Sequence, residues 1–201
     1  GYFNFQYSII KEKKDIFGFE LYLVNIPELF DRKNVYGYQD DIERFLSFQI
    51  ATLNWINSRI TTPDVINCHD HHTGLIPFMM QYSYKYHKLK NIPTVITIHN
   101  GLYQGQFSFD KLYYIPEFES SKISILDWDN CINSLAVAVK CASVVTTVSP
   151  SYLDEINKSA GGLENLFKMV REKSKGILNG IDIEVWNPAD DKMIEENYSI
   201  K

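Results

Sequence analysis

Three stretches of the sequence place acid–base and hydrogen-bonding side chains directly after a short apolar run. Residues 69–72 read His-Asp-His-His, and His99 with Asn100 follows a run of β-branched residues. Asn179 ends a third run of this kind. Imidazole, carboxylate and amide groups can exchange protons or bind polar ligands. These positions are therefore the first candidates for a functional site.

The spacing of these residues disfavours several familiar chemistries. Residues 69–72 crowd together, but neighbours on a strand point to opposite faces, whereas metal ligands must converge on one atom. The sequence has no HExxH pattern for zinc, no GxSxG for a hydrolase nucleophile and no GxGxxG for a dinucleotide. We therefore expect no metal ion. A purely structural role for His99, as a hydrogen-bonding residue within a turn, remains open at this point.

The scaffold that would position these clusters is predicted from the alternation of strand-like and helix-like segments. Residues 94–98 are five β-branched residues in a row, typical of a parallel strand buried on both faces. Further strands are predicted over residues 2–7, 17–26, 65–68, 143–148 and 175–179, and helices over about 41–57, 73–88, 128–142 and 163–170. Asp40 or Asp41 is the predicted cap of the first helix and Thr73 of the second, and a further short helix is predicted to start with Ser149 as its cap and Pro150 at its first position.

This alternation predicts an α/β fold with a Rossmann-like, mainly parallel sheet and helices on both faces. Residues 106–122 carry aromatic side chains without a clear period and predict a long functional loop. In a parallel sheet the carboxyl ends of the strands share one edge, where ligands bind. The three polar clusters should therefore converge on one crevice.

Composition narrows the class of protein. The 201 residues carry a net charge of −5, which argues against nucleic acid as a partner because phosphate binding needs basic patches. Three cysteines without CxxC spacing indicate neither a disulfide framework nor a zinc site, and they favour a reducing, cytoplasmic location. No apolar run approaches membrane-spanning length, and no signal peptide is expected.

Six blocks of sequence, in order, carry a resemblance to a known family. They read IPELFDRKNVYGYQDDIERFLSF, DVINCHDHHTGLIP, TVITIHNGLYQGQF, SVVTTVSPSYLDEI, GGLENLF and KGILNGIDIEVWNPADD, and they span residues 26–191. In content and spacing this chain resembles bacterial glycogen synthases and plant starch synthases. Any one block alone would be weak evidence for this resemblance, whereas six blocks in the same order and spacing make it specific.

The resemblance implies a retaining glucosyltransferase of the GT-B architecture, in which two Rossmann-like domains enclose the active site. Residues 1–185 would form the N-terminal, acceptor-side domain, and residues 186–201 would begin the linker to a C-terminal domain. The implied reaction moves glucose from a nucleotide sugar, expected to be ADP-glucose, to the non-reducing end of an α-1,4-glucan. The implied partners are these two substrates, with no cofactor, nucleic acid or membrane.

The resemblance also implies roles for individual residues. The family's TIHN histidine lies against the donor glucose, so His99 takes that role, and Asp70 would hydrogen-bond near the same sugar. Positioning and electrostatics, without a covalent nucleophile, would then drive the transfer. The other residues expected to bind substrate are Asn100, Tyr103 and Gln104 on the cleft floor, His71 beside Asp70, and Asn179 toward the acceptor or the domain junction.

The sequence also departs from the family pattern. His71 stands where the family usually has Trp, which removes an indole that would stack on an acceptor sugar. The family's Lys-x-Gly-Gly loop is not found, and residues 161–162 match a later glycine pair. We therefore expect a fragment that lacks its first βα unit and the C-terminal domain, and that is inactive by itself.

Two other functions fit the same residues. The chain could be a glucan-binding or assembly module without catalysis, or part of a GT-B glycosyltransferase that uses another donor. Binding of a maltooligosaccharide without affinity for a nucleotide sugar would fit a fragment as well as a binding module. A longer parent reading frame, with the Lys-x-Gly-Gly loop upstream and a second Rossmann-like domain downstream, would decide for the enzyme.

Overall fold

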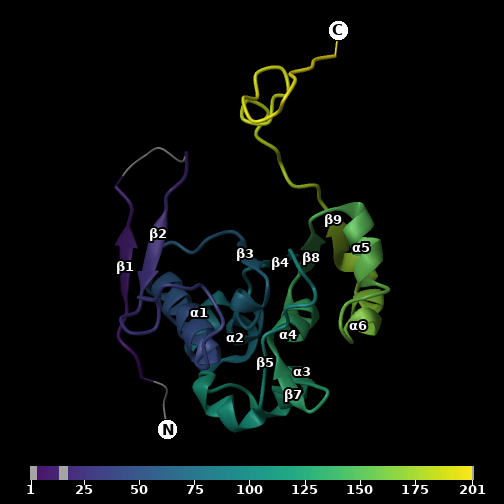
Figure 1. Cartoon of the computed structure of the whole chain (residues 1–201). Coiled ribbons are helices and arrows are strands. Elements are labelled where there is room, and N and C mark those ends of the chain that lie inside the picture. The colour runs from purple at the N-terminus through teal and green to yellow at the C-terminus, as the bar shows by residue number, and fades with distance from the viewer. Residues whose placement is uncertain (1–3, 14–17, 201) are drawn as a thin grey trace.

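A four-stranded parallel sheet is the central feature of the computed structural model, which describes residues 4–13 and 18–200 (Figure 1). Every neighbouring pair of strands in it is parallel. The carboxyl ends of all four strands therefore lie at one edge, as the sequence predicted. The strand order is β3 (Ile66–His69), β4 (Thr94–Ile98), β8 (Val144–Thr147) and β9 (Ser174–Gly176).

Helical segments connect successive strands of this sheet, which makes the fold α/β as predicted. Between β3 and β4 lie η1 (His71–Thr73), α2 (Ile76–Tyr82) and η2 (Tyr84–Leu89). Between β4 and β8 lie η3 (Phe109–Tyr114), η4 (Ser120–Lys122), α3 (Ile123–Leu126) and α4 (Ser134–Cys141). Between β8 and β9 lie α5 (Pro150–Ile156), α6 (Glu164–Met169) and η5 (Arg171–Lys173).

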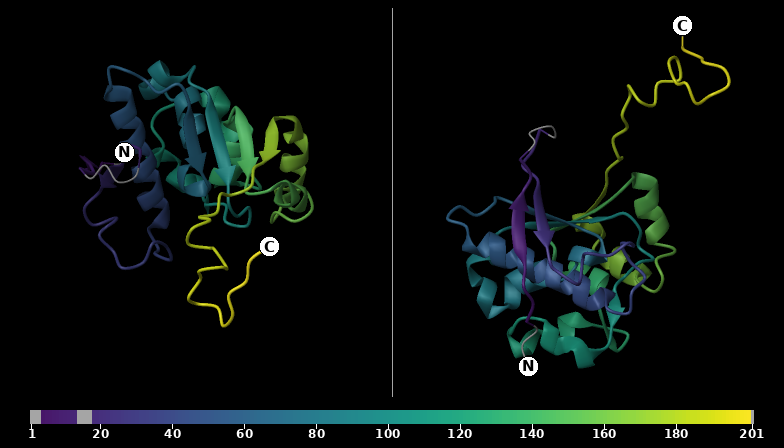
Figure 2. Two further views of the ribbon diagram at one scale, coloured as in Figure 1. Left: turned by 90° about the horizontal axis from the view of Figure 1, so that it is seen from above. Right: turned by 60° about the vertical axis from the view of Figure 1, so that its left-hand side comes forward.

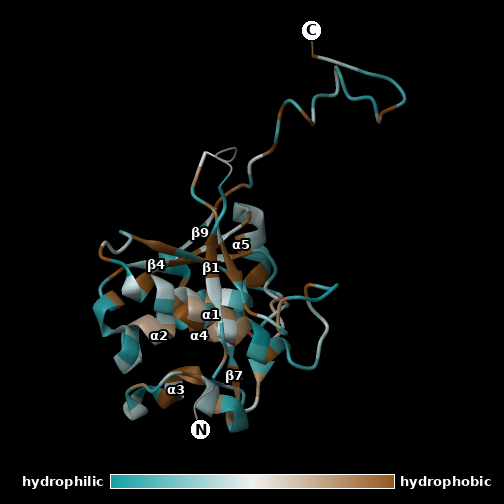
Figure 3. Ribbon diagram, turned by 90° about the vertical axis from the view of Figure 1, so that its left-hand side faces the viewer, coloured by the Kyte–Doolittle hydropathy of each residue, from teal (hydrophilic) through white to brown (hydrophobic). Residues whose placement is uncertain are grey.

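The two faces of the sheet have different surroundings. One face carries Cys68, Ile96 and Val145, which are at most 1% exposed and pack in the main apolar core. The helices α1 (Asp41–Ser58), α2 and α4 lie on one side of β4 and β9, whereas the chain after β9 leaves toward the other side (Figure 3). Helices were expected on both faces. Within the described residues the second face is open, and Val95 and Thr97 of β4 are only half-buried.

Smaller elements surround this sheet. An antiparallel hairpin of β1 (Ser8–Lys11) and β2 (Tyr22–Asn25) projects beside α1 (Figure 2). A second antiparallel sheet contains β5 (Gln106–Phe107), β7 (Cys131–Asn133) and β6 (Asp127–Trp128). After β9, residues 177–200 form turns and extended chain that are largely exposed.

The prediction of one helix over residues 128–142 was wrong in its first part. Residues 127–133 form the hairpin of β6 and β7, and α4 begins only at Ser134. Asp129 and Asn130 occupy the turn with φ values of 53° and 62°. Aspartate and asparagine tolerate this left-handed conformation, so this pair was the sequence signal for a hairpin.

Two predicted helix starts also need correction. Thr73 does not cap a single helix to Lys88, because its hydroxyl bonds the backbone of His69 and the segment divides into η1, α2 and η2. Asp40 precedes α1 as expected but does not cap it, since its carboxylate pairs with Arg32. By contrast, Ser149 caps α5 and accepts from the N–H of Tyr152, as predicted.

The ends of the chain differ from the prediction as well. Part of the strand predicted over residues 2–7, and part of the turn that follows it, lie outside the described residues. Residues 4–7 are not a strand, and pairing begins at Ser8. The strand predicted over 175–179 is β9, which ends at Gly176, and the chain after Trp186 forms turns.

Candidate active site

Two histidines from neighbouring strands meet at the carboxyl edge of the sheet. His69 ends β3 in register with Thr97, so His99 lies just beyond it on the adjacent strand. Nδ1 of His69 and Nε2 of His99 are 2.9 Å apart, within hydrogen-bond distance. The rings are inclined by 24° with centroids 5.2 Å apart. The parallel register therefore brings together two residues that are 30 positions apart in the sequence.

Asp70 links the same two strand ends through the backbone. Its Oδ1 accepts hydrogen bonds from the N–H of His99 at 2.8 Å and from the N–H of Asn100 at 3.5 Å. Its own N–H donates to the carbonyl of Thr97 at 3.0 Å. Asp70 has φ 54° and ψ −171°, a conformation that is unfavourable for a residue with a side chain. The aspartate thus positions the chain around His99.

Side chains at the strand ends alternate between two hollows, as the period of a strand requires. The first, here called the sheet-face hollow, has a volume of about 360 Å³ and lies over the open face of the sheet. Its lining comes from the ends of β3, β4 and β8 and from the segment after β9. It is lined by Asn67, His69, Val95, Thr97, His99, Thr146, Thr147, Val148, Ile177, Leu178, Asn179 and Gly180.

The second, here called the aromatic hollow, has a volume of about 610 Å³. Tyr36 and Tyr103, 63% and 67% exposed, are among the residues that line it. Inside, the ring of His72 lies 4.4 Å from that of Phe45 and 6.0 Å from that of Tyr36. It is lined by Tyr36, Gly37, Asp41, Ile42, Phe45, Asp70, His71, His72, Asn100, Tyr103 and Gly105.

The loop that carries Tyr36 is fixed by a buried arginine. Arg44 of α1, 2% exposed, donates to the carbonyls of Leu29 and Val35 and pairs with Asp41. Asp41 in turn accepts from the N–H of Gly37 at 2.7 Å. A guanidinium suits this position because its several donors have a rigid planar arrangement. Arg44 therefore shapes one wall of the aromatic hollow.

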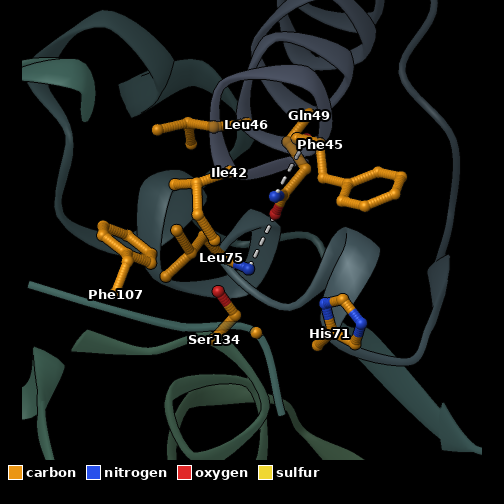
Figure 4. Close-up of a pocket in the computed structure, with 9 residues that line it drawn as sticks. Ile42, Phe45, Leu46, Gln49, His71, Leu75, Phe107 and Ser134 are labelled. Atoms are coloured by element: carbon orange, nitrogen blue, oxygen red, sulfur yellow. Dashed lines mark hydrogen bonds between the residues drawn. The ribbon is translucent and has the colours of Figure 1, made fainter. Parts of the chain in front are cut away.

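A small cavity of about 10 Å³ lies beside the aromatic hollow, between α1 and the chain after β3 (Figure 4). Gln49, 2% exposed, crosses it: its oxygen accepts from the N–H of Leu75 at 2.8 Å, and its amide donates to the carbonyl of Phe45. His71 lies at the side of this cavity, against Gly105. Because a Cβ at Gly105 would come within 2.5 Å of Nδ1 of His71, the glycine makes room for that ring.

Three histidines of this edge, His69, His71 and His72, have a pKa lowered toward the neutral imidazole. Burial lowers the pKa of His71 to about 4, with a smaller contribution from the neighbouring His72 ring. Burial also lowers the pKa of His72. The pKa of His69 is lowered by burial and by repulsion from His99, while Asp70 acts in the opposite direction. An uncharged imidazole can donate a hydrogen bond to a hydroxyl group or accept one from it. Near neutral pH, these rings add little positive charge to the site.

The structure separates the predicted site residues into groups. His99 and Asn179 line the sheet-face hollow, whereas Asp70, His71, Asn100 and Tyr103 line the aromatic hollow. Gln104 is 7% exposed, and its amide bonds the carbonyls of Ala160 and Gly161. Its geometry favours a structural role, and a role in binding substrate stays a prediction.

The sequence analysis assigned no role to three residues that contribute to this site. His69 contacts His99, Tyr36 lines the aromatic hollow, and the hydroxyl of Tyr152 accepts from the N–H of Gly101 at 2.8 Å. The signal for His69 was present, because it ends a strand predicted to pair with the strand before His99. Tyr36 lies in a loop and Tyr152 on a helix, so only the tertiary contacts reveal them.

Other kinds of site find little support in the described part of the chain. Its residues include no group of three or more His, Cys, Asp or Glu side chains arranged to hold a metal ion. Among residues 4–13 and 18–200, no helix combines the length and the apolar character needed to cross a lipid bilayer.

A parallel α/β sheet with a polar crevice at its carboxyl edge defines the class of the fold, a Rossmann-like domain. The starch synthase catalytic domain family matches residues 2–169, and the chain belongs to this family. Glycogen synthase of Flavobacterium johnsoniae is 70% identical over all 201 residues. A glycogen synthase of Streptococcus pneumoniae is 38% identical over 199 residues, which is 96% of this chain.

A solved structure confirms the fold. The catalytic domain of starch synthase IV from Arabidopsis thaliana, bound to ADP and acarbose, superimposes with a TM-score of 0.77 at 26% identity. The match covers 97% of this chain and 44% of that one. The chain likewise spans 42% of the length of both curated relatives. The predicted family and the predicted N-terminal half of a GT-B architecture are thus confirmed.

Proposed function

We propose that this chain forms the acceptor-side wall of the active site in a retaining glucosyltransferase of the glycogen or starch synthase type. The enzyme would move glucose from a nucleotide sugar to the non-reducing end of an α-1,4-glucan. Family membership and the names of the two glycogen synthase relatives support this reaction. The proposed donor is ADP-glucose, and the ADP bound to the Arabidopsis protein supports it.

One observation carries the proposal: Asp70 fixes the backbone of His99 at the point where both hollows meet the strand ends. In the proposed mechanism His99 lies against the donor glucose, and its carbonyl and imidazole ease positive charge at the anomeric carbon. Such a group acts by position, so the chain supplies no covalent nucleophile. Tyr36 and Tyr103 would pack on the apolar C–H faces of acceptor glucose units.

As part of the same proposal, the 201-residue chain by itself would transfer no glucose. The diphosphate of a nucleotide sugar is usually bound by Arg or Lys. Neither hollow is lined by an Arg or Lys among the described residues. The cationic groups for the donor would therefore come from outside these two hollows.

A reducing, cytoplasmic setting is also part of the proposal. Cys68 and Cys141 are buried, and burial raises the pKa of each thiol to about 12. Cys68, Cys131 and Cys141 are all free thiols. Buried, protonated thiols are unreactive, and they suit a compartment where disulfides do not form.

The test uses Flavobacterium johnsoniae glycogen synthase in which this chain replaces the matching segment. Transfer of radiolabelled glucose from ADP-glucose to glycogen is measured with and without His99→Ala. We expect the substitution to lower kcat by about a hundredfold, the usual effect of removing one electrostatic group at a reacting centre. His87→Ala, at an exposed position on η2, is the control and should leave transfer unchanged. If His99→Ala retained transfer within a few-fold of the parent, the role of His99 would be refuted.

A further inference from the structure

The contact between His69 and His99 has a chemical consequence for the site. Two imidazole nitrogens 2.9 Å apart can share one proton, with one ring donating and the other accepting. If both nitrogens carried hydrogen, the two N–H groups would point at each other. The hydrogen bond therefore requires that only one of the two facing nitrogens carries hydrogen. Two imidazolium rings do not fit this geometry.

The backbone of His69 is held in place independently of His99. The hydroxyl of Thr73 accepts from the N–H of His69 at 2.6 Å and donates to its carbonyl at 2.8 Å. Asp70, the next residue, is bonded to β4 and its end in two ways. Its carboxylate accepts from the N–H of His99, and its own N–H donates to the carbonyl of Thr97. His69 thus has a rigid base from which its ring can constrain another ring.

The surroundings of the pair offer few competing partners. Besides the two histidines, the polar residues that line the sheet-face hollow carry no charge; they are Asn67, Thr97, Thr146, Thr147 and Asn179. The Oγ1 of Thr97 bonds to Asn67 and to Thr146, so these groups are engaged with one another. Asp70 is the charged neighbour, and its Oδ1 is used by the backbone of His99 and Asn100. The ring of His69 is therefore the partner that controls Nε2 of His99.

We propose that His69 is a positioning residue, which fixes the tautomer and ring orientation of His99 through Nε2. Nδ1 and the carbonyl of His99 then remain as its groups for a sugar ligand. This inference rests on the proposed function of His99, because the constraint matters for catalysis only if His99 contacts the donor. His69 itself is assigned no contact with substrate.

The hydrogen bond makes a specific spectroscopic prediction. If His69 donates from Nδ1, then His99 is protonated on its own Nδ1, and if His99 donates from Nε2, then His69 is protonated on its own Nε2. In both arrangements the two neutral rings carry hydrogen on the nitrogen of the same name. Unconstrained rings would instead exchange between tautomers and show averaged nitrogen shifts.

The first experiment records histidine ring ¹⁵N shifts of the 201-residue chain at pH 8. We expect one tautomer at His99 and the same tautomer at His69. His69→Ala should give averaged shifts at His99, and His69→Asn should restore a single tautomer because an amide can occupy the place of Nδ1. Unchanged signals from His71, His72 and His87 would show that each variant is folded. Averaged shifts at His99 in the parent chain, or no change in His69→Ala, would overturn the inference.

The second experiment measures glucose transfer in the Flavobacterium chimera described above. His69→Ala should lower kcat about tenfold or more with little change in KM for glycogen, and His69→Asn should recover most of the loss. If His99→Ala abolished transfer while His69→Ala left it intact, this inference alone would fail. If His99→Ala had no effect, the proposed function would fail, whatever the ring shifts showed.

Discussion

Asp70 combines an unfavourable backbone conformation with side-chain hydrogen bonds to the backbone of the neighbouring strand end. Its φ of 54° lies in the left-handed region, and its carboxylate fixes two N–H groups of the neighbouring strand end. Strained residues of this kind persist where the surrounding structure determines them, often at functional sites. At the residue scale, the geometry of His99 therefore depends on Asp70 and His69.

This strain can be measured by comparing Asp70→Gly with Asp70→Ala. Both substitutions remove the carboxylate and should lower the free energy of unfolding by about 1–3 kcal/mol. Glycine relieves the backbone strain, so the Gly variant should be more stable than the Ala variant by about 1 kcal/mol after its larger chain entropy is counted. Urea unfolding followed by circular dichroism gives both values. Lower stability of Asp70→Gly than of Asp70→Ala would show that the strain at this position is smaller than the entropy cost of glycine, which would contradict this account.

The connection after β3 determines how closely η1 and α4 can approach. Gly74, at the end of η1, lies so near α4 that a Cβ there would be 2.4 Å from the carbonyl oxygen of Ser134. Gly101, in the loop after β4, has more space, since its Cβ would be 3.6 Å from the nearest side-chain atom of Ile156. Packing at the element scale thus depends on a glycine whose backbone conformation is ordinary.

Substituting these two glycines tests the close approach. Gly74→Ala should lower the free energy of unfolding by about 1–3 kcal/mol, because the backbone of α4 must move to accept the methyl group. Gly101→Ala is the matched control, and we expect it to be neutral or to stabilise the chain by up to about 1 kcal/mol. Chemical denaturation of both variants decides the point. A loss of stability as large for Gly101→Ala as for Gly74→Ala would contradict this account.

The whole molecule has a core on one side of its parallel sheet and an open surface on the other. The residues of α4 from 135 to 139 are fully buried, as are Ile96 of β4 and Val145 of β8. By contrast, the hairpin β1–β2 is mostly exposed, and so are residues 177–200. Stability should therefore be distributed very unevenly along the chain.

Hydrogen exchange measured by NMR tests this distribution. Backbone amides of β4, β8 and α4 should exchange slowest, because they open only when most of the core unfolds. Hydrogen-bonded amides of β1 and β2 should exchange faster by about a hundredfold or more, since a two-stranded hairpin that is mostly exposed opens locally. Protection in the hairpin equal to that in β4 would mean that it belongs to the same cooperative unit.

The sequence by itself determined the class of fold, the family and most of the residues at the carboxyl edge. The β-branched run of residues 94–98 formed β4 with the predicted boundaries, because such a run fits a buried strand. Ser149 and Pro150 likewise began a helix as predicted. These features depend on local chemistry, which a linear pattern contains.

Only the tertiary structure decided which of those residues contact one another. The register of β3 against β4 joins His69 to His99, and the alternation of side chains places Asp70 and His99 in different hollows although they share a hydrogen bond. The burial of Gln104 and the open second face of the sheet also depend on contacts between distant segments. Such contacts follow from how whole elements pack, so the spacing of residues along the chain does not contain them.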